Sequence, residues 1–305
     1  MTVFTVPCVG ESVYFYSPYK TQGIRLRNVL IAGCGDVGCE LAIRLRAEGH
    51  DVWGLRRHVE NLPAGIMPVR CDLREKISPD LLPAQIDQVV FLPTPGSRDE
   101  TAYQSVFQQG LEHLLSALET EERSVSRLVF VSSTSVYGQS AGEFVDENSV
   151  TEPEAFSGRI LVEAENVARH CSIPSVVVRF AGIYGPGRNG LINRVKSGAA
   201  CSEHPTHYTN RIHRDDCAGV LRHVLALRCP ADTYLGVDDE PADLCEVMDW
   251  MASRLGVAKP PRRTREDAGQ FTGKRCRNTE LKASGYRFEY RNYRLGYNDL
   301  LARTP

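Results

Sequence analysis

A glycine-rich turn between an apolar run and an amphipathic stretch constrains this chain more than any other feature. Gly33-x-Gly35-x-x-Gly38 follows the apolar run 29–32, and apolar residues then recur at helical spacing. In a strand–turn–helix unit the first glycine permits the tight turn, the second lets the backbone approach a pyrophosphate, and the third lets helix and strand pack closely. The N–H groups at the helix N-terminus favour that anion. The pattern predicts a dinucleotide-binding turn that comprises Gly33, Gly35, Asp36, Val37 and Gly38.

The end of the second expected strand, Asp51–Leu55, indicates which dinucleotide binds. NAD-binding units place an acidic residue there, which accepts a hydrogen bond from the ribose 2′-hydroxyl. This chain has Arg56 and Arg57 instead. An acid would repel a 2′-phosphate, whereas two guanidinium groups would bind it. The sequence therefore predicts NADP(H) in preference to NAD(H).

Composition narrows the class of protein further. A formal net charge of -2 argues against nucleic acid as a partner. No apolar run approaches the ~20 residues that a membrane span needs. The first 27 residues lack the basic start and apolar block of a signal peptide. We interpret residues 1–27 as an extension before the first strand and assign it no function.

Cysteine and histidine usage indicates a cytoplasmic protein without a metal site. The ten cysteines include no CxxC pair, and the eight histidines include no HExxH motif. Cys34 and Cys39 flank the glycine turn, where a disulfide would distort the backbone. We therefore expect all ten cysteines to be reduced thiols.

Strand-like and helix-like segments alternate along the first 180 residues. This alternation predicts an α/β fold with a doubly wound parallel sheet of the Rossmann type. The strand candidates are short continuous apolar runs, as in strands buried on both faces. Helical stretches lie between most of them, notably 99–118 and 158–171. The candidates are Asn28–Ala32, Asp51–Leu55, Met67–Cys71, Gln88–Leu92, Leu128–Ser132 and Ser175–Phe180.

From about residue 185 the pattern loosens into turn-rich stretches between short helices. We expect a dinucleotide-binding domain over residues 28–184 and a smaller substrate-binding or lid region over 185–305, part of which returns to the sheet. Ligands of such folds bind at the carboxyl ends of the strands. The segments expected around that crevice are the glycine turn, Pro93–Gly96, Ser132–Tyr137 and Ala181–Arg188.

Further motifs make the chain resemble the extended short-chain dehydrogenase/reductase superfamily, which includes the NAD-dependent epimerases and dehydratases of nucleotide sugars. A GRxLxEAE segment at 158–165 and the ending GKRCRN…GY are similar to an atypical, YeeZ-like branch. With the glycine turn, the matching motifs cover most of residues 28–240. In order they are Cys71-Asp72-Leu73, VFVSSTSVYG at 129–138, FVDE at 144–147, RFAGIYGPGRN at 179–189 and NRIHRDDCA at 210–218.

The resemblance implies roles for several of these residues. Asp72 and Leu73 would border the adenine, and Pro93 would line the crevice. Ser133 would hydrogen-bond a substrate carbonyl or hydroxyl, with Thr134 beside it. Tyr184 would lie near the nicotinamide. Plainer alternatives exist: Ser133 caps the strand end, Asp72 is a turn aspartate, and Arg179 is a paired structural charge under the sheet.

The chain departs from the superfamily where its chemistry resides. The family's Tyr-x-x-x-Lys pair supplies a general acid/base and a lysine that holds the nicotinamide ribose. If Glu163 aligns with the glutamate that follows the lysine, Ala155 replaces the tyrosine and Arg159 replaces the lysine. Arg159 can still contact a ribose or phosphate, but a guanidinium stays charged and is a poor proton shuttle.

Other groups could supply the proton. Tyr137 lies in the serine loop, although the matching family tyrosine is usually structural. His213 could titrate near neutral pH, whereas Asp216 is expected to support the fold at a helix N-terminus. Glu147 is an acid in a loop that is more simply read as a hydrogen-bond acceptor. The sequence does not choose among them.

Two main functions remain open. The first is an NADP(H)-dependent oxidoreductase or epimerase with an altered proton relay, which acts on a small polar carbonyl or hydroxyl compound. The basic end, 274–294, is either a solvated surface or a wall that binds a phosphate- or carboxylate-bearing substrate such as a nucleotide sugar. The second is a non-catalytic NADP(H)-binding sensor, and a purely structural protein is a weaker third. Related proteins often form homodimers through the helices expected here at 99–118 and 158–171.

Overall fold

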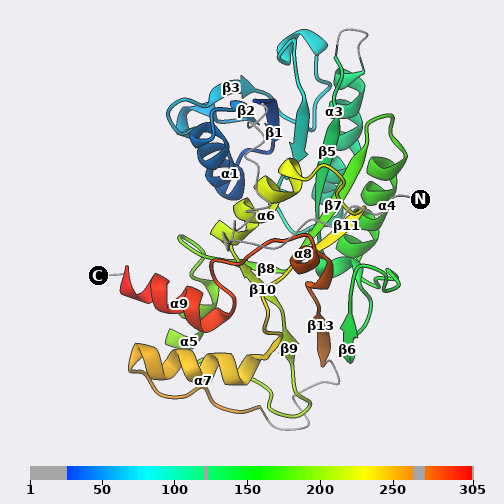
Figure 1. Ribbon diagram of the computed structural model, residues 1–305. Helices are drawn as coiled ribbons and strands as arrows, with labels where there is room; N and C mark the ends of the chain where they lie inside the picture. Colours follow the sequence, from blue (N-terminus) through cyan, green and yellow to red (C-terminus); the bar gives the residue numbers. More distant parts are fainter. Residues whose placement is uncertain (1–25, 120–122, 264–271, 304–305) are drawn as a thin grey trace, which may run out of the picture.

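The centre of the computed structural model is a seven-stranded, fully parallel sheet in the order β11-β7-β5-β4-β1-β2-β3 (Figure 1). The structure describes residues 26–119, 123–263 and 272–303, so most of the expected extension lies outside it. All six strands expected from sequence belong to this sheet, which confirms the doubly wound fold. Its strands are β1 (Asn28–Ala32), β2 (Asp51–Arg56), β3 (Met67–Arg70), β4 (Gln88–Phe91), β5 (Arg127–Ser133), β7 (Ser175–Phe180) and β11 (Thr233–Gly236).

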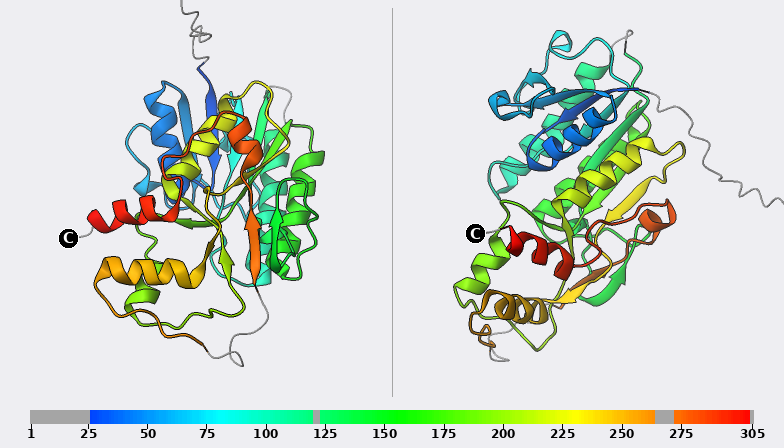
Figure 2. Two further views of the ribbon diagram at one scale, coloured as in Figure 1. Left: turned by 60° about the horizontal axis from the view of Figure 1, so that its bottom comes forward. Right: turned by 60° about the vertical axis from the view of Figure 1, so that its left-hand side comes forward.

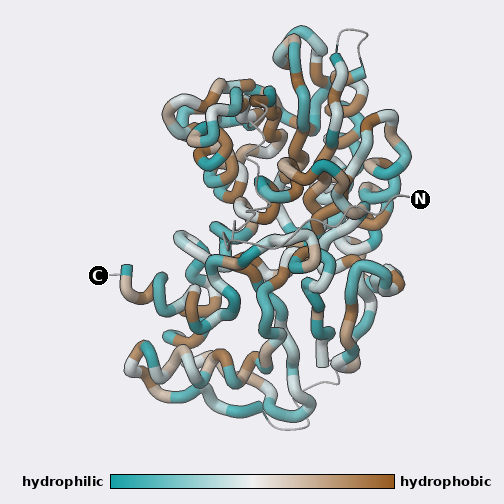
Figure 3. The backbone as a smooth tube through the Cα atoms, in the orientation of Figure 1, coloured by the Kyte–Doolittle hydropathy of each residue, from teal (hydrophilic) through white to brown (hydrophobic). Residues whose placement is uncertain are grey.

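Helices cover both faces of the sheet, as two views at different angles show (Figure 2). Side chains alternate along a strand, so β1 sends Val29 and Ile31 into one core and Leu30 into the other. The first core contains α1 (Asp36–Ala47) and α6 (Arg214–Ala226). The second contains α3 (Gly110–Leu118) and α4 (Phe156–His170). The central strands are accordingly hydrophobic over most of their length (Figure 3).

The helical stretch expected at 99–118 is divided into three parts. Asp99 caps the first, α2 (Glu100–Tyr103), by accepting a hydrogen bond from the N–H of Ala102 at 2.9 Å. A π-helical turn, Gln104–Gln109, follows directly and leads into α3. Short 3-10 turns occupy Val59–Asn61, Pro79–Leu81 and Thr134–Val136.

The C-terminal part forms a smaller lobe with its own hydrophobic core, below the main sheet in Figure 1. The chain leaves this lobe to add α6 and the edge strand β11 to the main sheet. Tyr293, Met248 and Val195 pack the lobe's interior. Its helices are α5 (Gly190–Lys196), α7 (Leu244–Leu255) and α9 (Tyr293–Ala302), whereas α8 (Thr279–Ala283) packs against β11 and the first core. The short strands beside the lobe are β6 (Ala141–Val145), β8 (Gly182–Tyr184), β9 (Tyr208–Thr209), β10 (Arg211–His213), β12 (Ala242–Asp243) and β13 (Gly273–Cys276).

The core of the lobe corrects one expectation about cysteines. Cys201 and Cys245 are joined by a disulfide, with their Cα atoms 5.6 Å apart. The two residues are 44 positions apart in sequence and meet because α7 packs against the segment that follows α5. The expectation that all ten cysteines are reduced is therefore wrong for this pair. The other seven described cysteines are free thiols.

The described residues offer neither a membrane-spanning helix nor a cluster of metal ligands. None of the helices there combines the length and apolar character required to cross a membrane. Within the same residues, no group of three or more histidine, cysteine, aspartate or glutamate side chains is arranged to hold a metal ion.

Candidate cofactor and active site

Two adjoining pockets open at the carboxyl ends of the central strands. The first, here called the arginine pocket, lies beside the ends of β2 and β3, and the second, the serine crevice, runs past the end of β5. All ten predicted cofactor-binding residues line one or both of them. The arginine pocket contains Gly33, Gly35, Leu55, Arg56, Arg57, His58, Cys71, Asp72, Leu73, Arg74, Pro93, Thr94, Gly96 and Val106. The serine crevice includes Gly33, Gly35, Asp36, Val37, Gly38, Pro93, Tyr103, Phe107, Ser133, Ser135, Ser157, Leu161, Phe180, Ile183 and Arg188.

The three glycines of the turn have three different geometries. Gly33 has a φ of 88°, and a Cβ there would lie 2.5 Å from Cα of Pro93. At Gly38 a Cβ would come within 3.2 Å of Ile31 Cγ2, so the helix packs closely on β1. At Gly35 a Cβ would meet no atom closer than the Gly33 carbonyl oxygen at 3.8 Å. Protein packing therefore does not require glycine at position 35. The open space beside Gly35 is where a pyrophosphate would lie.

The N-terminus of α1 faces this space. Gly35 begins the helix without a side-chain cap, so no side chain occupies its first N–H groups. The acid in the first turn, Asp36, is paired with Arg188 at 2.8 Å and Arg214 at 3.1 Å. These ion pairs offset the negative charge of Asp36. The residues present therefore fit a dinucleotide at this helix end.

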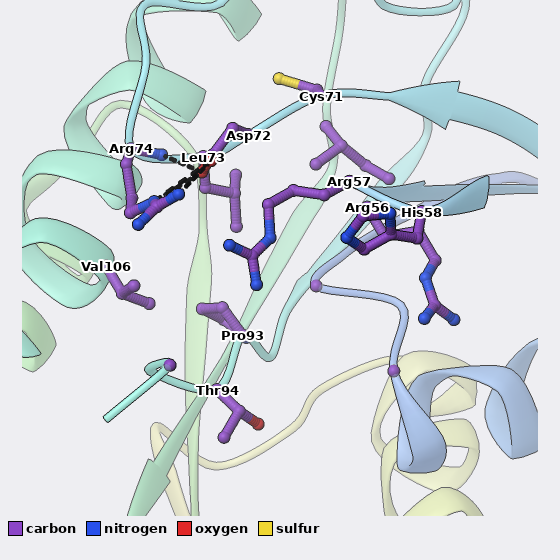
Figure 4. A pocket seen from close by; sticks show the side chains of 14 residues that line it. Arg56, Arg57, His58, Cys71, Asp72, Leu73, Arg74, Pro93, Thr94 and Val106 are labelled. Atoms are coloured by element: carbon purple, nitrogen blue, oxygen red, sulfur yellow. Dashed lines mark hydrogen bonds and ion pairs between the residues drawn. The ribbon is translucent and has the colours of Figure 1, made fainter. Parts of the chain in front are cut away.

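Arginines dominate the pocket beside β2 (Figure 4). Arg57 is exposed and extends between Leu73 and Pro93, whereas Arg56 points toward α1 and donates to the Cys34 carbonyl oxygen at 3.0 Å. No carboxylate is paired with either guanidinium among the described residues. The pocket therefore presents positive charge where an adenosine ribose would carry its 2′ substituent.

Asp72 borders the same pocket and also shapes a turn. Its carboxylate accepts hydrogen bonds from the backbone N–H of Arg74 at 3.1 Å and from the Arg74 guanidinium at 2.6 Å. The Arg74 guanidinium beside it lowers the pKa of the Asp72 carboxyl group. Asp72 thus acts as a turn aspartate, the plainer of the two readings, while it also lines the pocket.

Four serines line the crevice: Ser132 and Ser133 at the end of β5, Ser135 in the following 3-10 turn, and Ser157 on α4. Ser133 Oγ accepts a hydrogen bond from the Ser135 N–H at 3.1 Å, so the capping alternative describes a real contact. That contact uses a lone pair and leaves the hydroxyl proton available for a ligand.

The residues of α4 that face the crevice are not Ala155 and Arg159, the two that align with the Tyr-x-x-x-Lys pair in sequence. Ser157 and Leu161, four residues apart and therefore on one helix face, line the crevice. Arg159 is exposed, does not line either pocket, and donates to the backbone carbonyl oxygen of Glu154. Residues two apart on a helix point to different faces, so Arg159 lies on another face than Ser157. A contact of Arg159 with a ribose or phosphate stays a prediction.

Tyr184 and Thr134 also lie outside the two pockets, and their expected roles stay predictions. Tyr184 is 4% exposed, and its ring stacks on Tyr297 of α9 at 4.4 Å. Burial raises the pKa of the Tyr184 phenol. Its strand, β8, pairs with β10 rather than with the main sheet, which directs the side chain into the C-terminal core. Thr134 is buried in the 3-10 turn behind Ser133.

His213 and Asp216 support α6 rather than the crevice. His213 Nδ1 accepts from the N–H of Asp215 at 3.2 Å, and burial lowers the pKa of the imidazole. The carboxylate of Asp216 accepts hydrogen bonds from the Tyr286 hydroxyl at 2.8 Å and from the backbone N–H groups of Glu289 and Tyr290. Asp216 therefore ties the start of α6 to the C-terminal segment, as expected of a structural acid.

A buried ion pair supports the serine loop from below. Arg179 on β7 forms two contacts with Glu165 on α4, at 3.0 and 2.6 Å, and donates to the Tyr137 hydroxyl at 2.7 Å. Both Arg179 and Tyr137 are thus structural. Glu147 accepts from the Leu235 N–H at 3.0 Å, which is the plainer reading given above.

The basic C-terminal stretch is largely engaged in surface contacts. Lys282 and Arg291 pair with Asp239, and Arg294 contacts Glu240 and Glu246. None of these basic side chains lines the arginine pocket or the serine crevice. The contacts agree with a solvated charged surface.

Sequence reasoning missed Tyr103. It lines the serine crevice one helical turn before Phe107. The available signal was an aromatic pair four residues apart, but in a helix that covers a sheet such a pair is usually assigned to the core.

This sheet, with a glycine turn at its first crossover and a serine-bearing loop after β5, has the architecture of a dinucleotide-binding α/β protein. The model of the NAD dependent epimerase/dehydratase family matches residues 29–204. The chain belongs to this family.

Individual relatives agree with that assignment. Protein YeeZ of Escherichia coli K12 is 28% identical over 277 residues, which cover 87% of this chain and 97% of YeeZ. A solved structure of a proposed NAD-dependent epimerase/dehydratase from Methylobacillus flagellatus is 35% identical, with a TM-score of 0.74 over 91% of this chain and 98% of that one. UDP-glucuronic acid 4-epimerase from Bacillus cereus, solved with NAD, shares the fold at 17% identity and a TM-score of 0.74, covering 90% and 97% of the two chains.

Proposed function

We propose that this protein is an NADP(H)-dependent oxidoreductase or epimerase-like enzyme that acts on a small polar carbonyl or hydroxyl compound. Arg56 and Arg57, with no carboxylate partner among the residues described, carry the preference for NADP(H). The glycine turn would hold the pyrophosphate, and Asp72 and Leu73 would border the adenine. The cofactor, when bound, would supply or accept a hydride. The protein's own residues must bind the substrate oxygen and handle its proton.

The serine crevice favours a small substrate. Ser133, Ser135 and Ser157 offer hydroxyl groups, whereas Phe107 and Leu161 supply apolar walls. Such a lining binds a polar oxygen at one side and a carbon skeleton at the other. We infer that the Ser133 hydroxyl donates to a substrate oxygen, while its lone pair stays on the Ser135 N–H. The Bacillus epimerase acts on a nucleotide sugar, which is a large anion. In this chain no basic residue of 274–294 lines either pocket, so these residues do not favour a substrate of that kind.

Cofactor choice is the direct test. Titrations of NADP⁺ and NAD⁺ by calorimetry should show at least tenfold tighter binding of NADP⁺. Arg57→Ala should weaken NADP⁺ binding by roughly 10- to 100-fold, since a charge-assisted hydrogen bond is worth about 1.5–3 kcal/mol. NAD⁺ affinity should change less than about twofold. Arg46→Ala, at the far end of α1, is the matched control. Equal affinities of the wild type for both cofactors would refute the NADP(H) assignment.

A non-catalytic NADP(H) sensor is the second candidate. It is favoured by α4, which presents Ser157 and Leu161 to the crevice and so lacks a Tyr-x-x-x-Lys pair there. In that case Ser133→Ala would leave cellular function intact, while Arg56→Ala with Arg57→Ala would abolish it. Loss of function in a folded Ser133→Ala protein would exclude the sensor.

A further inference from the structure

The serine crevice needs a group that exchanges a proton with a substrate oxygen. Neither Ser157 nor Leu161, the α4 residues that face it, titrates near neutral pH. Tyr137 and Tyr184, the phenols suggested by sequence position, are 2% and 4% exposed and do not line it. A proton donor must therefore come from another element.

Tyr103, the last residue of α2, is placed to do this. Its ring packs edge-on against Phe156 at 5.6 Å and 88°, beside the first residues of α4, and lies 5.5 Å from the Phe107 ring. Among the lining residues of the serine crevice it is the sole phenol. The side chain is partly exposed, and no hydrogen bond to its hydroxyl is formed within the part of the chain that the structure describes. The two aromatic contacts hold the ring and leave the hydroxyl available.

The local backbone is unusual at this point. A π-helical turn, Gln104–Gln109, begins directly after Tyr103. Such turns are rare and are often found at functional sites. In this chain the π-helical turn lies between α2 and α3. Tyr103 therefore belongs to the four-residue helix α2, which contacts α4, and not to the longer helix α3.

We propose that Tyr103 is the catalytic acid/base of this site, in place of the tyrosine that the family carries on α4. The proposal rests on the function proposed above. In the reducing direction the substrate carbonyl carbon gains a hydride, which bound NADPH would supply and so become NADP⁺. The C=O π bond breaks toward oxygen, and that oxygen takes the phenolic proton of Tyr103. The Tyr103 phenolate then regains a proton from water. The reverse direction oxidises an alcohol by the same transfers.

The test uses the full chain and Tyr103→Phe, with Tyr208→Phe as control. Tyr208 lies on β9, outside the crevice, and its ring contacts Arg275. NADPH affinity is measured by fluorescence, and turnover by NADPH oxidation with phenanthrenequinone and a panel of small aldehydes and ketones. Independently of activity, acetylation of each tyrosine by N-acetylimidazole is mapped by mass spectrometry with and without NADP⁺.

Three results support the proposal together. Tyr103→Phe should bind NADPH within about twofold of the wild type and lose at least about 100-fold in kcat, as expected for a lost general acid. Tyr208→Phe should change neither value. NADP⁺ should slow acetylation of Tyr103 at least fivefold and leave that of Tyr208 unchanged.

Other results overturn it in distinguishable ways. A Tyr103→Phe protein with wild-type kcat, or acetylation of Tyr103 that NADP⁺ does not slow, overturns the role of Tyr103 alone. Wild-type protein that binds NADPH but reduces none of the compounds overturns both that role and the enzymatic function. Wild-type protein that does not bind NADPH overturns the NADP(H) assignment first.

Discussion

The two sides of the crevice are held in place by different kinds of interaction. The cofactor side, residues 29–57, depends on backbone geometry within one strand–turn–helix–strand unit, in which Gly33 adopts a φ of 88°. The substrate side depends on buried polar pairs that join segments far apart, such as Arg179 on β7 with Glu165 on α4. A local motif can therefore stay intact while the opposite wall changes its chemistry.

Removing Glu165 should have the largest effect on stability. Glu165→Ala leaves Arg179 buried without its carboxylate, and breaking such a pair costs about 3–5 kcal/mol of unfolding free energy. The Tyr137 hydroxyl shares the same guanidinium, so the serine loop should loosen as well. Urea unfolding measures the loss.

The control for Glu165 lies two residues away. Glu163 on the same helix is exposed, and Glu163→Ala should change stability by less than about 0.5 kcal/mol. Similar losses for both variants would show that the buried pair does not hold the substrate side.

Gly33→Ala should have a slightly smaller effect, and it should act on the cofactor side. A positive φ costs a non-glycine residue roughly 1–2 kcal/mol, and the Cβ would lie 2.5 Å from the Pro93 backbone. We expect a loss of about 3 kcal/mol in urea unfolding and no measurable NADPH binding. Gly96→Ala, where a Cβ meets nothing within 4 Å, should unfold like the wild type. Unchanged NADPH binding in Gly33→Ala would contradict the glycine geometry.

The contrast also explains what the sequence could and could not predict. Strands β1 and β7 were placed at their observed boundaries because apolar runs and turns depend on near neighbours. The positive φ of Gly33 is likewise local, although the closeness of Pro93 to the Gly33 backbone is not. Arg56 and Arg57 follow from the strand end in the same way. Local rules therefore place these residues at the strand end, while their roles toward a cofactor stay predictions.

Long-range contacts set the limits of prediction on the substrate side. Tyr184 turns away from the crevice because Tyr297, more than a hundred residues later, stacks on it. Cys201 meets Cys245 because the separate core of the C-terminal lobe brings them together. Tyr103 was overlooked because its helix was assigned wholly to packing. None of these outcomes follows from spacing within one segment.

Asp238 should make the stability of the protein depend on pH. It follows β11, is 2% exposed, and burial raises its pKa to about 8. A folded-state pKa above the unfolded value means that stability is present at low pH and is lost as pH rises toward 8. Relative to Asp238→Asn, the wild type should lose about 2 kcal/mol of unfolding free energy between pH 6 and pH 8. Parallel pH profiles for the two proteins would show that Asp238 does not titrate in this range.

Arg188 joins the two sides, and its removal should have the smallest effect on stability. It lines the serine crevice and pairs with Asp36 at the start of α1, with side chains 39% and 37% exposed. Exposed pairs contribute little, so Arg188→Ala should cost less than about 0.5 kcal/mol. NADPH should nevertheless bind roughly three- to tenfold more weakly at low salt, because the charge of Asp36 at the helix N-terminus is then offset by Arg214 alone among its present partners.

Salt separates this effect from a structural one. The difference between wild type and Arg188→Ala in NADPH fluorescence titrations should shrink at 0.5 M salt, since screening weakens interactions between exposed charges. Arg194→Ala, on α5 and outside the crevice, is the control and should match the wild type at both salt concentrations. A difference that persists at high salt would mean that Arg188 shapes the crevice through packing. Residues of the substrate side would then affect cofactor binding through packing contacts as well as through charge.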